Sequence, residues 1–124
     1  MRDSNLRKIT KSIEIVYGLR NFIGNANKFS KTTIYINLKS DSESTEITIE
    51  DDGNGYPKDV LPKIGEPYLS SSSQEKSKKG LGLGLFIGKT LLEKNFASIN
   101  CRNSKVRGGA EVIVKWNNKD LFNI

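Results

Sequence analysis

An acidic residue at the end of an alternating segment is the first candidate for chemistry. In TEITIED, residues 45–51, apolar and polar residues alternate, so Asp51 faces inward with Ile47 and Ile49. A carboxylate that points inward needs donor partners, because burial without them is costly. Gly53 and Gly55 follow in an open turn. Either Asp51 accepts hydrogen bonds from the amides of its own turn, or it binds a flat ligand, such as one with an exocyclic amine, that the glycines admit.

Two asparagine side chains and a lysine form a second candidate group. Asn21, Asn25 and Lys28 are four and three residues apart, so they share one face of a helix. Asparagine is a poor helix former, and two on one face suggest a polar cleft. Amide oxygens suit Mg²⁺ when phosphates supply its other ligands, and Lys28 could then meet a phosphate. A solvated helix face is the alternative.

A glycine-rich stretch, KKGLGLGLFIGKTLLEK at 78–94, is the third candidate. Gly80, Gly82 and Gly84 lead into apolar residues at helical spacing, which predicts a helix from about 83 to 95. Backbone amides at a helix N-terminus are a natural phosphate site. The GKT at 88–90 is not a Walker A motif, because the required first glycine is replaced by Leu83. Close packing of the helix on the sheet explains one glycine, but three poorly.

The remaining pattern predicts the elements that position these residues. A helix is expected over 12–29, with Ser12 as a possible N-cap and an apolar face of Ile13, Val16, Leu19, Phe22, Ile23 and Ala26. Half-buried strands are expected at 32–40 and 45–51, joined by a hairpin, and further strands near 98–103 and 110–116. A short helix or turn begins at Pro57.

The order of these elements predicts the fold class. The segment 65–79 has no periodicity and four consecutive serines, which indicates a mobile loop or lid. The rest runs helix, two strands, loop, helix, two strands. This order predicts an α+β fold, a two-layer α/β sandwich whose mixed, mostly antiparallel sheet carries helices on one face.

Composition limits the chemistry further. The chain has 124 residues and a net charge of +6, and this length is enough for one domain with a core. Its single cysteine excludes an internal disulfide. Alternation with Ile99 predicts that Cys101 is a small buried residue rather than a redox sensor. No apolar run approaches the roughly 18 residues of a membrane span. Because the chain lacks histidine, any phosphohistidine must come from outside it.

Taken in order, four motifs resemble the ATP-binding catalytic domain of sensor histidine kinases. This is the Bergerat (GHKL) fold, shared with gyrase, MutL and heat-shock chaperone ATPases. NFIGNANKF resembles the N-box, DDGNG the first glycine box, GEPYLSS the start of the ATP lid, and GLGLGLFI the second glycine box. The resemblance covers about residues 13 to 116. GEPY and FIGKTLLEK look most similar to the RegB/PrrB group of redox-responsive kinases.

The resemblance implies roles for the candidate residues. Asp51 binds the adenine amino group, Asn25 coordinates Mg²⁺, and the glycine-rich amides hold the triphosphate while the lid at 65–79 closes over it. Asn21, Asn25 and Lys28 form the catalytic group. The implied site for ATP and Mg²⁺ comprises Asn21, Asn25, Lys28, Asp51, Gly53, Gly55, Tyr68, Gly80, Leu81, Gly82, Leu83, Gly84 and Leu85.

The resemblance also implies partners and domain limits. Residues 1–11 are a tail leading from a missing dimerisation domain, 12–118 the catalytic domain, and 119–124 a C-terminal tail. The phosphate acceptor is a histidine of that dimerisation domain, and a response regulator follows it in the relay. The fragment itself is expected to be monomeric and cytoplasmic, with no membrane or nucleic-acid contact, although its parent could be anchored in the inner membrane.

One departure favours a kinase over a free ATPase. The hydrolysing relatives resemble one another in having a glutamate four residues before the magnesium asparagine, as base for the attacking water. Here that position is Asn21, whose amide is not basic. Two alternatives stay open: a stand-alone serine kinase of the anti-sigma type, and a basic binding module that uses KSKK.

Overall fold

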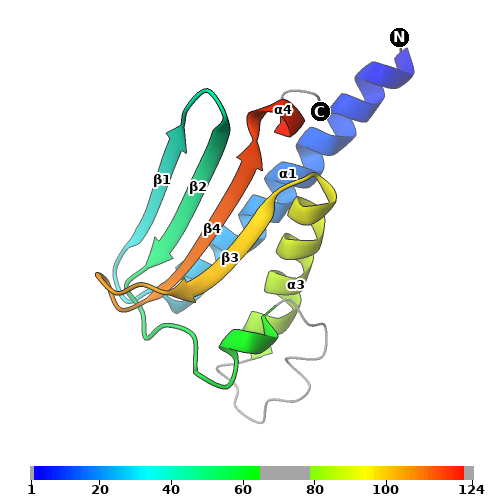
Figure 1. Ribbon diagram of the computed structural model, residues 1–124. Helices are drawn as coiled ribbons and strands as arrows, with labels where there is room; N and C mark the ends of the chain where they lie inside the picture. Colours follow the sequence, from blue (N-terminus) through cyan, green and yellow to red (C-terminus); the bar gives the residue numbers. More distant parts are fainter. Residues whose placement is uncertain (1, 65–78, 122–124) are drawn as a thin grey trace.

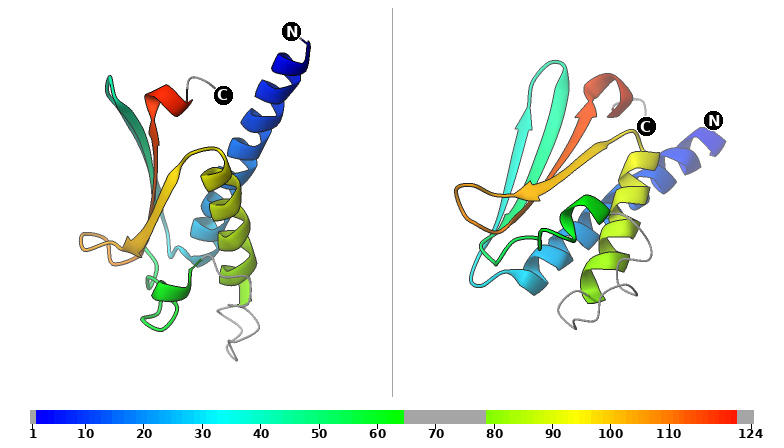
Figure 2. Two further views of the ribbon diagram at one scale, coloured as in Figure 1. Left: turned by 45° about the vertical axis from the view of Figure 1, so that its right-hand side comes forward. Right: turned by 60° about the horizontal axis from the view of Figure 1, so that its bottom comes forward.

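The structure is a two-layer α+β domain with two helices on one face of an antiparallel sheet. This computed structural model describes residues 2–64 and 79–121, with side chains for 10–64 and 84–121. Helices α1 (Arg2–Phe29) and α3 (Lys79–Lys94) lie side by side against the sheet (Figure 1; Figure 2, left). The predicted fold class is confirmed. Among the described helices, none is both long and apolar enough to span a bilayer.

Four strands form the sheet in the order β1-β2-β4-β3, and every pairing is antiparallel. They are β1 (Ile34–Ser40), β2 (Ser44–Asp51), β3 (Ser98–Asn103) and β4 (Ala110–Asn117). Two short helices complete the described chain, η1 (Leu61–Lys63) and α4 (Asn118–Leu121), so α4 begins just before the expected C-terminal tail. The turn expected at Pro57 is present, since its carbonyl accepts the amides of Val60 and Leu61, each at 3.0 Å.

Both helices begin earlier than the sequence pattern predicted. Helix α1 starts at Arg2 and not near Ser12, which is therefore not its N-cap. Residues 2–11 lack a clear apolar period but also lack glycine and proline, so nothing in them interrupts a helix. Helix α3 starts at Lys79 and not at 83. Gly80 and Gly82 are consequently part of its first turn rather than a loop before it.

The core lies between the helices and the two central strands. Alternate residues of β4 are buried as expected, namely Ala110, Val112, Val114 and Trp116. The strand β1 is more exposed than expected, with Leu38 70% exposed and Ile36 53%. It is an edge strand, and the helices pack over β2 and β3 rather than over β1 (Figure 2). The expected apolar face of α1 also opens to solvent near its middle, where Ile13 is 63% and Val16 56% exposed.

Two glycines allow α1 and α3 to approach closely. A β-carbon at Gly88 would lie 2.9 Å from the Phe22 ring and 3.1 Å from the carbonyl oxygen of Gly18. One at Gly18 would lie 2.8 Å from Cγ of Leu92. Real β-carbons essentially never come within 3.0 Å of a neighbour, so the present spacing of the two helices depends on the absence of a side chain at both positions.

Candidate functional site

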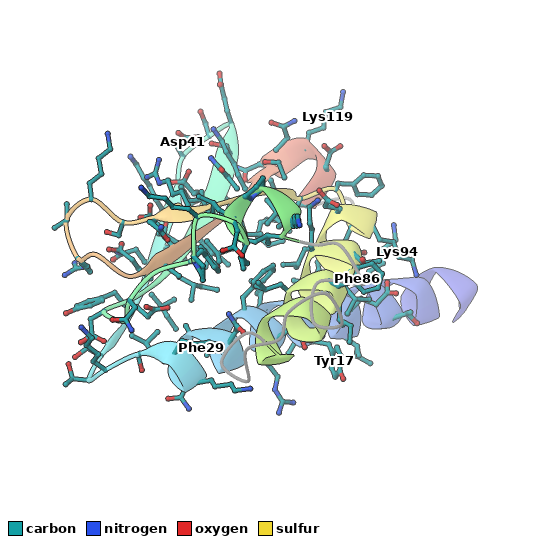
Figure 3. The ribbon with its side chains drawn as sticks, turned by 90° about the horizontal axis from the view of Figure 1, so that it is seen from below. Tyr17, Phe29, Asp41, Phe86, Lys94 and Lys119 are labelled. Atoms are coloured by element: carbon teal, nitrogen blue, oxygen red, sulfur yellow. The ribbon has the colours of Figure 1, made fainter. Side chains whose placement is uncertain are left out.

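The predicted site residues gather at one end of the molecule. The end of α1, the end of β2 and the start of α3 meet there; Figure 3 views the molecule from this end, with Phe29 of α1 labelled. One close approach and one ordinary contact show the arrangement. A β-carbon at Gly53 would lie 2.1 Å from the carbonyl oxygen of Phe29, and one at Gly84 would lie 4.0 Å from Oδ1 of Asn21. The second expected glycine box is therefore beside the expected N-box.

Asp51 is the buried acid of this region. It ends β2 and is 2% exposed, as its inward position predicted. Its Oδ1 accepts the amide of Gly53 at 2.8 Å and the amide of Ala110 at 3.2 Å. The first interpretation, in which Asp51 binds amides of its own turn, is therefore confirmed for the amide of Gly53, whereas the amide of Ala110 belongs to the start of β4. Because both of these hydrogen bonds end on Oδ1, a ligand role for Oδ2 stays a prediction.

The glycines after Asp51 are required by close backbone packing. Gly53 lies against the end of α1, as described above. Gly55 has a φ of +80°, and a β-carbon there would lie 2.9 Å from Oδ1 of Asn103. That amide oxygen accepts the backbone amide of Tyr56 at 2.6 Å, and Nδ2 of Asn103 donates to the Tyr56 carbonyl at 3.0 Å. The turn after β2 is thus fastened to the end of β3.

The expected magnesium group lies on α1. Nδ2 of Asn21 donates to the carbonyl of Tyr17 at 2.8 Å, which leaves its Oδ1 on the side of α3. Asn25 is half-buried one turn later, and its side-chain amide makes no hydrogen bond among the described residues. Two such oxygens beside a helix N-terminus fit Mg²⁺ bound with phosphates. Lys28 is exposed, with Nζ 5.5 Å from the centre of the Phe29 ring.

The first turn of α3 offers its backbone amides. An α-helix leaves its first four N–H groups without helical acceptors, here those of residues 79–82. Gly80, Leu81 and Gly82 are therefore in the expected position to bind an anion, whereas the amide of Gly84 falls within the helical pattern. Leu85 is fully buried in the core. Tyr68 and the rest of the expected lid up to residue 78 lie outside the described residues.

A second carboxylate, Asp52, fastens the loop between α1 and β1. Its Oδ1 accepts the amide of Lys31 at 2.8 Å, and its Oδ2 accepts the hydroxyl of Thr32 at 2.5 Å. The Thr32 hydroxyl, followed by the amides of Thr32, Thr33 and Lys31, lowers the pKa of Asp52 far below 3.8. The two acids of DDGNG therefore have different roles. Asp51 faces the core, and Asp52 binds the loop between α1 and β1.

A buried phenol, that of Tyr56, and a half-buried thiol, that of Cys101, interact near the site. Burial, followed by the charges of Cys101 and Asp51, raises the pKa of the Tyr56 hydroxyl. Burial raises the pKa of Cys101 to about 11, against the opposing effect of its hydrogen bond with Tyr56. Cys101 is half-buried rather than fully buried. Its raised pKa suppresses the thiolate, which agrees with the packing role expected of it.

The hairpin between β3 and β4 was missed by the sequence analysis. Its glycine pair, Gly108 and Gly109, comes directly before the alternating strand β4 and is the signal that could have revealed it. A β-carbon at Gly109 would lie 2.0 Å from the carbonyl oxygen of Asp51 and 2.4 Å from its Oδ1. Ser104 and Arg107 of the same hairpin both contact Glu50, next to Asp51.

The family of the chain follows from comparison with known proteins. Residues 10–120 match the model of the histidine kinase-, DNA gyrase B- and HSP90-like ATPases. Sensor histidine kinase RegB of Cereibacter sphaeroides is 38% identical over 102 residues, covering 77% of this chain and 22% of RegB. Sensor protein kinase PilS of Pseudomonas aeruginosa is 35% identical over 98 residues, covering 73% of this chain and 18% of PilS. The chain thus spans about a fifth of the length of these relatives, and the expected resemblance to RegB is confirmed.

Solved structures agree with the fold. The catalytic domain of histidine kinase ThkA superposes with a TM-score of 0.67 at 22% identity, covering 85% of this chain and 67% of that one. Full-length ShkA, solved in complex with AMPPNP, gives a TM-score of 0.65 at 24% identity, covering 83% of this chain and 21% of that one. The chain belongs to the family of histidine kinase-, DNA gyrase B- and HSP90-like ATPases, as an ATP-binding catalytic domain of the sensor histidine kinase type.

Proposed function

We propose that this domain binds Mg-ATP at the end where α1, β2 and α3 meet, and presents the γ-phosphate to a histidine of a separate dimerisation domain. The observation that carries this proposal is the position of Asp51. It is buried and held by two amides on one oxygen, and its strand ends at the same end of the molecule as the end of α1 and the start of α3 (Figure 1). An acceptor for the adenine amine and donors for the phosphates are thereby combined in one place.

Each group of residues has a separate task in this proposal. Asp51 accepts a hydrogen bond from the exocyclic amine of adenine through Oδ2. The amides of residues 79–82 bind phosphate oxygens, and Lys28 adds a positive charge. Asn25, with Asn21 beside it, holds the magnesium ion, which neutralises phosphate charge when bound. Phosphoryl transfer depends chiefly on such positioning and charge compensation, so a domain of this kind can supply most of the catalysis.

The environment of Asn21 favours transfer over hydrolysis. Its Nδ2 donates to the Tyr17 carbonyl, so the side chain offers only an amide oxygen toward α3. An amide cannot remove a proton from water at neutral pH. ATP then persists until an external nucleophile arrives. We infer that this nucleophile is the histidine of the dimerisation domain, that a response regulator receives the phosphate next, and that the reaction takes place on the cytoplasmic side.

Calorimetry with ATP and Mg²⁺ tests the proposal. A hydrogen bond to a charged group contributes roughly 1.5–3 kcal/mol, so Asp51→Ala should weaken ATP binding about tenfold to a hundredfold. Asp51→Asn is the second variant, because it retains an acceptor for the amides of Gly53 and Ala110. Asp41→Ala is the matched control, since Asp41 lies in the β1–β2 hairpin and accepts the amides of Glu43 and Ser44 there. Equal affinity in the native chain and both Asp51 variants would refute the adenine assignment.

A further inference from the structure

The carboxylate of Asp51 is held from one side by the start of β4. The amide of Ala110 donates to Oδ1 at 3.2 Å, and Gly109 is so near that a β-carbon there would lie 2.4 Å from the same oxygen. These contacts belong to a strand that pairs with β2 only through Glu50 and the residues before it. The direction of the Asp51 carboxylate therefore depends on where residues 109–110 are placed.

Residues 104–109 form a compact loop that places Gly109. The amide of Ser104 donates to the carbonyl of Gly109 at 2.8 Å, and the amide of Gly108 donates to the carbonyl of Ser104 at 3.0 Å. The amide of Arg107 donates to Oγ of Ser104 at 3.1 Å. Gly108 adopts a φ of +79°, which other residues rarely adopt. Because the loop is closed by its own hydrogen bonds, the position of Gly109 is coupled to those of Ser104 and Arg107.

The loop is fastened to Glu50, the residue before Asp51. Oγ of Ser104 donates to Oε2 of Glu50 at 2.6 Å, and Nε of Arg107 lies 3.0 Å from the same oxygen. The guanidinium of Arg107 also lies 3.5 Å from the centre of the Tyr35 ring. Glu50 is only 7% exposed, so this charge needs its partners. Successive residues of a strand point to opposite faces, so this group lies on the face of the sheet opposite to Asp51.

We propose that Glu50, Ser104 and Arg107 are positioning residues for Asp51, which set how strictly the site selects adenine. The contacts run without a gap from Glu50 through the loop to Gly109 and Ala110, and from there to Oδ1. With Oδ1 fixed, Oδ2 is held in one direction for a ligand amine. This inference rests on the proposed function, because it assigns a role relative to the adenine contact of Asp51.

Base discrimination is the measurement that separates positioning from general stability. ATP and purine riboside triphosphate differ by the exocyclic amine, so the ratio of their affinities reports the Asp51 contact alone. Calorimetry with Mg²⁺ should give the native chain a preference for ATP of about tenfold or more. Arg107→Ala should reduce this preference at least about threefold. Arg107→Lys, which retains the charge, should restore part of it, and Glu50→Gln should act in the same direction as Arg107→Ala.

The control variant uses the neighbouring ion pair on the same face. Arg102 pairs with Glu111 and makes no contact with the 104–109 loop among the described hydrogen bonds. Arg102→Ala should therefore leave the preference for ATP unchanged. In an Asp51→Ala background, adding Arg107→Ala should change the preference no further, because the contact that it positions is already lost.

The outcomes distinguish this inference from the proposed function. A native chain that binds both nucleotides equally would refute the adenine contact of Asp51, and with it the positioning role. A native chain that prefers ATP, together with a folded Arg107→Ala variant of equal preference, would refute the positioning role alone. Should Arg107→Ala fail to fold, Glu50→Gln decides by the same criterion, since it retains a side chain of similar size.

Discussion

The contact between α1 and α3 at Gly88 can be tested by a matched pair of glycine substitutions. Gly24 of α1 and Gly88 of α3 are both inside helices, but a β-carbon at Gly24 would have nothing within 4 Å, whereas one at Gly88 would meet the Phe22 ring and the backbone of Gly18. Alanine at either position gains the same helix propensity, about 0.8–1.0 kcal/mol. The difference between the two variants therefore isolates the cost of the contact.

The expected magnitude follows from the distances. At 2.9 Å from a ring carbon of Phe22 and 3.1 Å from a carbonyl oxygen, the new methyl group at Gly88 must displace a buried side chain and a helix backbone. Overpacking of this kind costs typically about 1–3 kcal/mol. Gly24→Ala should therefore stabilise the domain by up to about 1 kcal/mol, and Gly88→Ala should be less stable than Gly24→Ala by about 1–3 kcal/mol.

Urea denaturation of the two variants measures this difference directly. The slope with denaturant should stay unchanged, so the midpoints report the free energy of unfolding. A double variant adds a check: Phe22→Leu should cost less in the Gly88→Ala background than in the native chain, because it makes room for the methyl group. If Gly88→Ala proves as stable as Gly24→Ala, the close approach of the two helices is not needed and the reasoning is wrong.

Three further predictions concern the site. Asn21→Glu should raise the rate of phosphate release from ATP, because it supplies the base that the native side chain lacks; an unchanged rate contradicts that explanation. Asp52 has a pKa lowered below 3.8 by folding, so its contribution to stability is complete above that pH and is lost as the pH falls below it. Asp52→Asn should accordingly flatten the loss of thermal stability in acid, and a parallel curve would contradict the role of its hydrogen bonds with Thr32. Cys101, with a pKa of about 11, should react slowly with iodoacetamide near neutral pH and faster as the pH rises toward that value; rapid labelling of the folded chain at pH 7 counts against this.

Features that depend on neighbouring residues in the sequence were predictable. Alternation identified β2 and β4 and placed Asp51 on the inner face, because side-chain direction in a strand depends only on position parity. The exposure of Leu38 was not predictable, since alternation cannot tell an edge strand from a central one. The predicted start of α3 was too late because Gly80 and Gly82 have low helix propensity. The first turn of the helix nevertheless contains both glycines.

Only those residues of the candidate site could be predicted whose type is unusual at their position in the sequence. Asp51, Asn21, Asn25 and the glycines were found because a buried acid, paired amides and missing side chains are unusual at those positions. The contact of Gly109 with Asp51 joins segments far apart in the sequence. So does the pairing of Arg107 with Glu50. Such contacts follow from strand order, and a charge in a hairpin has the same local pattern whether or not it finds a partner.

The length and continuity of helix α1 have a mechanical consequence for the site. It is a single helix of 28 residues, about 42 Å long at 1.5 Å per residue, and its first half projects past the end of α3 (Figures 1 and 2). A continuous helix has no joint that absorbs torque. Gly18 lies against Leu92, so a turn of α1 about its axis presses on α3 at this contact. Because Asn21 and Asn25 belong to the same helix, a twist applied to the projecting half acts on these two residues through α1 itself and on α3 through the contact of Gly18 with Leu92.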